Sequence, residues 1–375
     1  MRERPVAVDG LRRARALRCL PWALAVLVAL WAGWGTLQSG LRRGFWGDDF
    51  GLLPYYLVMP WWKPMVTRYA ANACYRPLGA EALWVANQAI GGMYLLPWKA
   101  LQAALHAGNL LLLFALIRRH SGAAVALPAV ALWGGLPHHI DARTWTADLP
   151  CLLGAAVLLA GLLAYQTRPL TGTFLVCLAI ATKELYVFAG VALLAVDLLA
   201  VRRVRWRYVL PAVALGLAWA ALVWWLSRSG WIIAARASER GGGPVVVFLR
   251  YWLFLTQGIA AIRFAPPPDV LLLGYWLHVG ALLLASTLIA GRRAVAPVLL
   301  LAGAAWAVAF IYFAPRYTYL PTAFLFWWAG AAAQAGLLVA WSLAKRSLLT
   351  SSAAGPGHSG AYSNAPPSPT RKEPV

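Results

Sequence analysis

The sequence predicts an all-α integral membrane protein, a polytopic helical bundle of about ten transmembrane helices. Hydrophobic residues make up 61% of the 375 residues and charged residues only 12%. A soluble domain carries about 25% charged residues, so this chain lacks the polar surface to cover itself in water. Charge-free apolar stretches recur along the chain, and most approach the ~20 residues that cross ~30 Å of hydrocarbon as a helix.

The predicted spans follow these apolar stretches in order. They cover about 20–38, 99–117, 122–136, 149–165, 169–182, 185–196, 208–227, 270–290, 294–315 and 317–344. The first follows a basic segment, as in a signal peptide, but it is too long and has no small-residue cleavage site, which favours an uncleaved helix. The apolar stretch 245–264 contains Arg250 and would break the alternation of charge, so we expect it to lie on the membrane or re-enter it.

The net charge of +21 argues for a membrane surface, not nucleic acid. The basic residues stand in short clusters between the spans, which is the pattern of the positive-inside rule. Placing the clusters in the cytoplasm puts both termini there and predicts a multi-pass protein of the cell membrane. The clusters are Arg118/Arg119, Arg202/Arg203/Arg205/Arg207, Arg292/Arg293 and Lys345/Arg346.

This topology divides the chain into three parts. Residues 1–19 form a cytoplasmic segment and residues 20–346 the transmembrane core, with outer loops at 39–97 and 228–268. Residues 347–375 are rich in Ser, Gly, Ala and Pro and are expected to be a disordered cytoplasmic tail. The four cysteines form no CxxC pair, so neither a disulfide framework nor a zinc site is predicted.

Most of the twelve acidic residues fall on the predicted outer face. Ionisable groups near a membrane are expensive unless they serve a site or reach water, so a layer at one face indicates a site open to that face. A transporter more often holds its charges near the midplane, between broken helices. The outer acidic residues are Asp48, Asp49, Glu81, Asp141, Asp148, Glu184, Glu239 and Asp269.

Asp48 and Asp49 are adjacent carboxylates just beyond the first span. Such a pair can supply a general base together with a charge or metal anchor. A solvated turn after Gly47 explains the same residues, and both interpretations stay open.

Three cations share the outer level. Arg76 and Arg316 stand in apolar, aromatic settings, and guanidinium groups match phosphate oxygens; Lys183 can place a cation beside a phosphate leaving group. Snorkelling to lipid headgroups, or a weak interfacial ion pair of Lys183 with Glu184, are the alternatives. Tyr317 follows Arg316 and shares its two interpretations.

The histidines have structural or substrate-contact interpretations. His106 and Asn109 lie three apart, on one helical face, where polar side chains bond neighbouring helices. His138, His139 and Asp141 resemble metal ligands, but adjacent side chains do not share a helix face, so no zinc site is predicted.

In this order, the motifs resemble the GT-C class of membrane glycosyltransferases, and most nearly the protein O-mannosyltransferases, including the group that carries tetratricopeptide repeats. The resemblance covers roughly residues 40–325. This chain departs from the repeat-carrying group because it lacks any repeat domain after the last predicted helix. The resemblance rests on Asp48-Asp49, Tyr75-Arg76-Pro77-Leu78, His106 with Asn109, Pro137-His138-His139 with Arg143 and Asp148, Lys183-Glu184, and Arg316 to Pro321.

The resemblance implies a transferase that moves a sugar from a polyprenyl-phosphate donor to a glycan, lipid or protein hydroxyl at the outer face. It implies that Asp48, with Asp49, is catalytic and that Arg76, Lys183 and Arg316 bind the donor phosphate. No cofactor is required by the sequence, although a divalent metal is compatible with it. The alternatives are a lipid or solute transporter or flippase, without chemistry, and an envelope polysaccharide polymerase or ligase.

Overall fold

The computed structural model describes residues 6–66, 76–136, 139–200, 203–228 and 319–353, with the isolated positions 284, 288, 297 and 298. Within these ranges the chain is mostly helical and contains no strand, which confirms the predicted all-α class. The elements are α1 (Val6–Arg43), α2 (Asp49–Val58), α3 (Lys63–Val66), α4 (Pro77–Ile90), α5 (Leu95–Ser121), α6 (Ala123–Gly135), α7 (Ile140–Thr144), η3 (Thr146–Asp148), α8 (Leu149–Tyr165), α9 (Pro169–Thr182), η4 (Glu184–Tyr186), α10 (Ala189–Ala200), α11 (Trp206–Arg228) and α16 (Tyr319–Ala353).

Four helices of the described part are long and apolar enough to cross a membrane: Cys19–Arg43, Leu95–Ser121, Thr146–Tyr165 and Tyr319–Arg346. Shorter apolar helices cover Ala123–Gly135, Pro169–Thr182 and Trp206–Leu222. These segments support the prediction of a membrane protein. The predicted spans at 270–290 and 294–315 and the outer loop 228–268 lie almost wholly outside the described residues.

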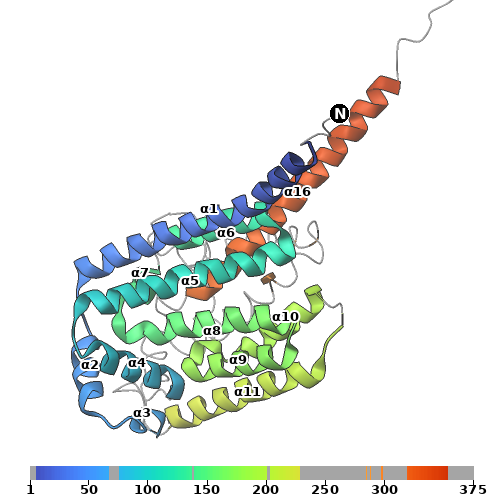
Figure 1. Cartoon of the computed structure of the whole chain (residues 1–375). Coiled ribbons are helices and arrows are strands. Elements are labelled where there is room, and N and C mark those ends of the chain that lie inside the picture. Colours follow the sequence, from blue (N-terminus) through green and yellow to red (C-terminus); the bar gives the residue numbers. More distant parts are fainter. Residues whose placement is uncertain are drawn as a thin grey trace, which may run out of the picture.

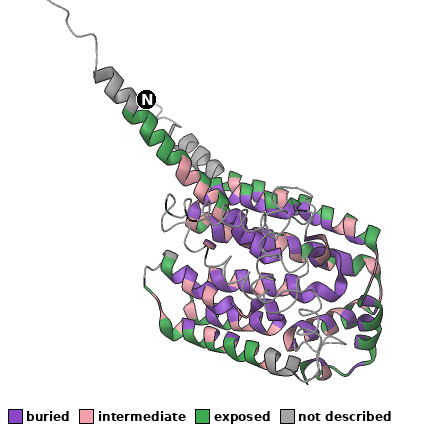
Figure 2. Ribbon diagram, turned by 180° about the vertical axis from the view of Figure 1, so that it is seen from behind, coloured by how far each residue is buried: buried purple, intermediate pink, exposed green. Residues whose placement is uncertain are grey.

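The long helices α1, α5 and α8 lie side by side, and α9 and α11 extend the bundle on the far side of α8 (Figure 1). Buried residues line the interior, whereas exposed residues cover much of the outer surface of α1 and α11 (Figure 2). On α1 that outer surface is apolar, since Leu30, Trp31 and Trp34 are each about 60% exposed. An apolar exterior over a packed interior is the arrangement that suits a lipid environment.

Glycines allow the closest helix contacts. A Cβ added at Gly172 of α9 would lie 2.3 Å from the Cα of Tyr165, and one at Gly79 of α4 would lie 2.2 Å from the carbonyl oxygen of Thr182. Small residues let backbones approach in a medium where burial of apolar surface gives little attraction between helices. The packing of α9 on α8, and of α4 on the end of α9, therefore depends on these two positions.

The predicted outer loop 39–97 is largely helical. It contains α2, α3 and α4, which cover one end of the bundle (Figure 1). Leu52, Leu53 and Tyr56 of α2 pack in a second apolar core with Leu83 of α4 and Trp98 of α5.

At the other end of the chain, α16 continues to Ala353, past residue 347 at which we predicted the tail to begin.

Candidate functional site

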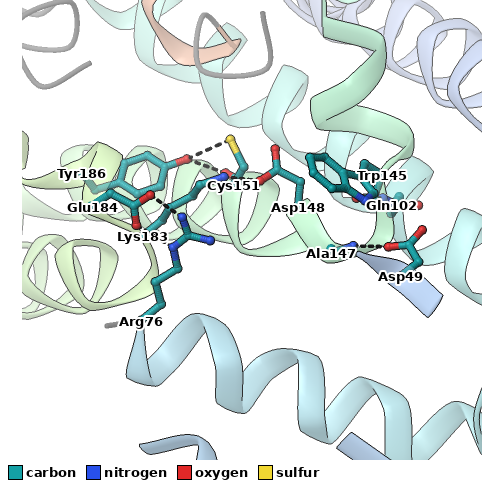
Figure 3. A network of polar contacts seen from close by, with 10 residues as sticks. All are labelled: Asp49, Arg76, Gln102, Trp145, Ala147, Asp148, Cys151, Lys183, Glu184 and Tyr186. Atoms are coloured by element: carbon teal, nitrogen blue, oxygen red, sulfur yellow. Dashed lines mark hydrogen bonds and ion pairs between the residues drawn. The ribbon is translucent and has the colours of Figure 1, made fainter. Parts of the chain in front are cut away.

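Polar side chains from several separate segments of the chain meet at the end of the bundle covered by α2 and α4. Figure 3 shows them in a row, from Asp49 beside Ala147, through Asp148 and Lys183, to Glu184 and Arg76. Pro77 and Pro150 stand in the first turns of α4 and α8. Proline is favourable there because the backbone N–H groups of a first helical turn have no partner within the helix. Arg76 and Asp148 immediately precede those helices and so lie at their N-terminal ends.

The two aspartates of the acidic pair differ in their surroundings. Asp48 is exposed, whereas Asp49 is fully buried. The Asp49 carboxylate accepts hydrogen bonds from the backbone N–H groups of Ala147 at 2.7 Å and Trp46 at 3.3 Å. Burial raises the pKa of Asp49, although these two donors and the nearby Lys99 ammonium act against the rise. Asp49 therefore anchors two segments, and Asp48 is the carboxylate that faces outward.

Arg76 forms a bidentate pair with Glu184. Its Nε donates to Glu184 Oε2 at 2.5 Å, its Nη2 donates to Oε1, and both side chains are buried. Burial alone would raise the pKa of the Glu184 carboxyl, but the charge and hydrogen bonds of Arg76, with the charge of Lys183, hold that pKa below 4.5. The pair fastens the start of α4 to η4.

Lys183 forms the second buried ion pair, with Asp148 Oδ1. The two pairs are adjacent, because Lys183 and Glu184 are neighbours in the chain (Figure 3). Two of the three cations predicted to bind phosphate, Arg76 and Lys183, are thus brought together, and each contacts a carboxylate. The third, Arg316, lies outside the described residues, as do Tyr317 and His138.

His106 and Asn109 of α5 both reach the start of α16. His106 Nδ1 lies 2.7 Å from Tyr319 Oη, and Asn109 donates to the same oxygen at 3.3 Å and to the carbonyl of Leu152 at 3.0 Å. His139 Nε2 lies 2.6 Å from Thr322 Oγ1. These histidines join α5 and the segment before α7 to α16.

Asp141, the acidic residue of the histidine cluster, forms an ion pair with Arg43 at 2.6 Å. His139 of the same cluster contacts Thr322 of α16. Among the described residues no group of three or more His, Cys, Asp or Glu side chains is placed to hold a metal ion.

Lys99 of α5 is a site residue that sequence reasoning missed. It is 1% exposed and donates to the Thr144 carbonyl at 2.6 Å and to Thr146 Oγ1 at 3.0 Å. Gln102, one turn later, donates to the Trp145 carbonyl at 2.8 Å. In the sequence Lys99 stands just before an apolar stretch, as a lysine at a membrane interface would, and its partners carry no charge that would reveal it.

At the opposite end of the bundle, the described residues include a cluster around the buried carboxylate of Asp197. Asp197 of α10 accepts from the backbone N–H and Nε of Arg205, each at 2.8 Å, and from Tyr165 Oη at 2.9 Å. The Arg205 guanidinium also lies over the Tyr165 ring, 4.2 Å from its centroid.

Comparisons of the chain with protein-family models, with curated proteins and with solved structures found no match.

Proposed function

We propose that the protein is a GT-C-type membrane glycosyltransferase that transfers a sugar from a polyprenyl-phosphate donor to an acceptor hydroxyl. The observation that supports this proposal best is the layer of buried charges at one end of the bundle, with an exposed carboxylate, Asp48, beside it. Arg76, Lys183, Asp148 and Glu184 are all buried there. A buried charged group is costly, and a set of four at the end of a membrane bundle favours a polar reaction over a merely structural boundary.

The proposed chemistry is a single displacement at the anomeric carbon. The Asp48 carboxylate takes the proton of the acceptor hydroxyl, and the acceptor oxygen forms the new bond to the anomeric carbon. The bond from that carbon to the phosphate oxygen breaks, and polyprenyl phosphate leaves with the electron pair. One displacement inverts the configuration of the sugar.

In the proposal, Arg76, Lys183 and Arg316 stabilise the negative charge of the donor phosphate. Glu184 and Asp148 orient two of these cations, because each carboxylate is hydrogen-bonded to one of them. Asp49 holds the backbone beside Asp48 through its bonds to Ala147 and Trp46.

A lipid-linked donor suits the surface around this layer. The exposed residues of α2 and the turn after it are largely apolar or aromatic: Phe50 is 60% exposed, Val58 83%, Trp61 59% and Trp62 51%. Tryptophan is typical of the membrane interface, where an acyl chain and a charged headgroup meet. A polyprenyl chain on this side would bring its phosphate to the level of the buried cations.

The proposal includes the finer topology of about ten spans with both termini in the cytoplasm. The distribution of charge supports it, since Arg118 and Arg119 end α5 and Arg205 lies at the end of the bundle opposite the polar layer. Under the positive-inside rule the polar layer would then face outward.

The test uses the full-length protein purified into lipid nanodiscs. It is incubated with polyprenyl-phosphate sugars labelled in the sugar and with acceptors extracted from cell envelopes, and label in the acceptor is measured. Transfer that requires the polyprenyl phosphate is the expected result. Movement of the labelled lipid across a vesicle membrane without any product would instead identify a flippase. Polymer growth that is unaffected by Asp48→Asn would identify a polymerase or ligase.

A further inference from the structure

The segment Thr144–Ala147 is held by side chains of two other helices, residue by residue. Lys99 donates to the Thr144 carbonyl and Thr146 Oγ1, and Gln102 donates to the Trp145 carbonyl. From the other side, the Asp49 carboxylate accepts the Ala147 N–H. The segment is therefore clamped between α5 and the start of α2.

The same segment fixes the chain just before the acidic pair. The Trp145 indole N–H donates to the Trp46 carbonyl at 3.1 Å, and the two indole rings stack with centroids 4.7 Å apart. The residue that follows the segment is Asp148, the partner of Lys183. One short stretch of backbone thus touches both Asp49 and the ion-pair layer.

Holding a backbone segment with Lys99 requires the burial of an ammonium group, which costs free energy. It lies inside a candidate membrane span, is 1% exposed, and forms no ion pair with any described carboxylate. Its ammonium is offset by two neutral oxygens, by the Phe45 ring, whose centroid lies 5.4 Å from Nζ, and by the charge of the nearby Asp49 carboxylate. A charged side chain buried near the end of a membrane helix is a candidate functional residue, because neutral side chains fill such space at lower cost.

We propose that Lys99 is a positioning residue for the acidic pair: its ammonium fixes Thr144–Thr146, this segment fixes Asp49, and Asp49 sets the direction of Asp48. The catalytic part of this inference rests on the proposed function. The structural part does not, because it concerns only how firmly Ala147 is held against Asp49.

The direction of Asp48 follows from its place in the chain. Asp48 is the N-cap of α2, and its carbonyl accepts from Leu52 N at 2.9 Å and Gly51 N at 3.1 Å. Its backbone therefore moves with the first turn of α2, which begins at Asp49. Release of Asp49 from Ala147 would free that turn, and a shift of about 1 Å can cost ~10²-fold in rate.

The experiment measures how firmly the segment Thr144–Ala147 is held, without any assay of activity. In a chain whose four cysteines are replaced by alanine or serine, Ala147→Cys introduces one thiol at a position that is 6% exposed. A membrane-impermeant maleimide then reports how often this position opens. We expect Lys99→Met to speed labelling about tenfold or more, equal to ~1.4 kcal/mol of lost protection. Lys99→Arg should restore slow labelling, because it keeps a cationic donor.

Two further variants keep the result decisive. Thr173→Val removes one hydrogen bond, 3.2 Å long, to the Tyr208 carbonyl on the far side of the bundle, and labelling at position 147 should stay slow. If Lys99→Met does not accumulate in the membrane, Thr146→Val removes one clamp bond at nearly constant volume and should give a smaller increase. Unchanged labelling in Lys99→Met, or in Thr146→Val where that variant takes its place, overturns the inference.

Transfer kinetics test the catalytic part. Lys99→Met should lower kcat about 10²-fold with little change in KM for the donor, and Lys99→Arg should recover most of kcat. Faster labelling with unchanged kcat would overturn the positioning role. If the native chain transfers no sugar and Lys99→Met still speeds labelling, the proposed function fails while the hold of Lys99 on the segment stands.

Discussion

At the end of the bundle covered by α2 and α4, buried carboxylates contact groups from distant parts of the chain. Arg76 and Glu184 are 108 residues apart, and Asp49 and Ala147 are 98 apart. At the opposite end, Asp197 bonds to Arg205, eight residues along the chain, and to Tyr165, 32 residues away. The first end joins elements about 100 residues apart, whereas the second closes the connection between α10 and α11 and ties it to the end of α8.

The two arrangements differ in their energetic cost. A connection between successive helices is held by a local pair with little loss of chain entropy, because the loop it closes is short. Two adjacent buried pairs that join distant segments are a costlier arrangement, since each ion must be desolvated and each partner must be placed by the whole fold. The cost is easier to understand if the charges also perform chemistry, which is the basis of the proposed function.

The largest expected effect separates the two ends by activity. Asp48→Asn keeps the shape of the side chain but removes its basicity, and we expect transfer to fall ~10²–10⁴-fold. Asp197→Asn, at the opposite end, should leave kcat within about threefold of the native value in the fraction of protein that stays folded. Both are measured by label transfer in nanodiscs. Equal losses in the two variants would mean that the two ends do not differ in function.

The next effect is on stability. Glu184→Ala leaves the Arg76 guanidinium buried without its main partner and should lower the free energy of unfolding by ~3–5 kcal/mol. Asp197→Ala should cost less, about 2 kcal/mol, because its partner Arg205 has an 18% exposed side chain and can turn toward water. Thermal unfolding in detergent, followed by tryptophan fluorescence, compares them.

The double variant Arg76→Leu/Glu184→Leu is the control for this comparison. It removes both charges together, so it should be more stable than Glu184→Ala. If the double variant is the less stable of the two, the hydrogen bonds of the pair, not the stranded charge, carry the effect.

Acid should lower the free energy of unfolding through Glu184, at the end of the bundle covered by α2 and α4. Its pKa is lower in the folded protein than the ordinary value of 4.5, so it contributes stability that is present above about pH 4.5 and is lost as the pH falls through the folded pKa. Asp49 acts in the opposite direction, because burial raises its pKa and the cost of its charge is relieved as the pH falls. The stability difference between the native chain and Glu184→Gln should therefore shrink below about pH 4.5.

The corresponding measurement is a set of melting curves between about pH 3 and 7 for the native chain, Glu184→Gln and Asp49→Asn. A native advantage over Glu184→Gln that persists unchanged into acid would contradict the low pKa of Glu184.

The helices could be predicted from the sequence more completely than the site. The apolar stretches that fall within the described residues are helical, because their length and lack of charge leave few alternatives in a membrane. The gathering of Asp49, Arg76 and Lys183 at one end was also expected from the alternation of basic clusters. The buried pairing of Arg76 with Glu184 was not, since no local pattern relates residues 108 positions apart.

The difference in burial between Asp48 and Asp49 also could not be predicted from the sequence. Both stand at the start of α2, and which of them is buried depends on the segment that packs against that turn. Lys99 was missed for a related reason, because its partners are a carbonyl and a hydroxyl, Thr144 O and Thr146 Oγ1. Neutral partners leave no charge pattern to find.

The smallest expected effect tests what makes the charged pairs at the end covered by α2 and α4 contribute to stability: their burial, or only their position in the fold. Arg43 and Asp141 form an ion pair at this end, 2.6 Å long, with side chains 35% and 22% exposed. Water can replace either partner, so Asp141→Asn should lower the free energy of unfolding by only ~0–1 kcal/mol. The effect should shrink further in high salt, which screens exposed pairs and leaves the Arg76–Glu184 pair nearly unchanged. The measurement is urea unfolding of Asp141→Asn and Glu184→Ala at low and high salt. An effect of Asp141→Asn as large as that of Glu184→Ala would show that position in the fold, not burial, sets the energetic importance of these pairs.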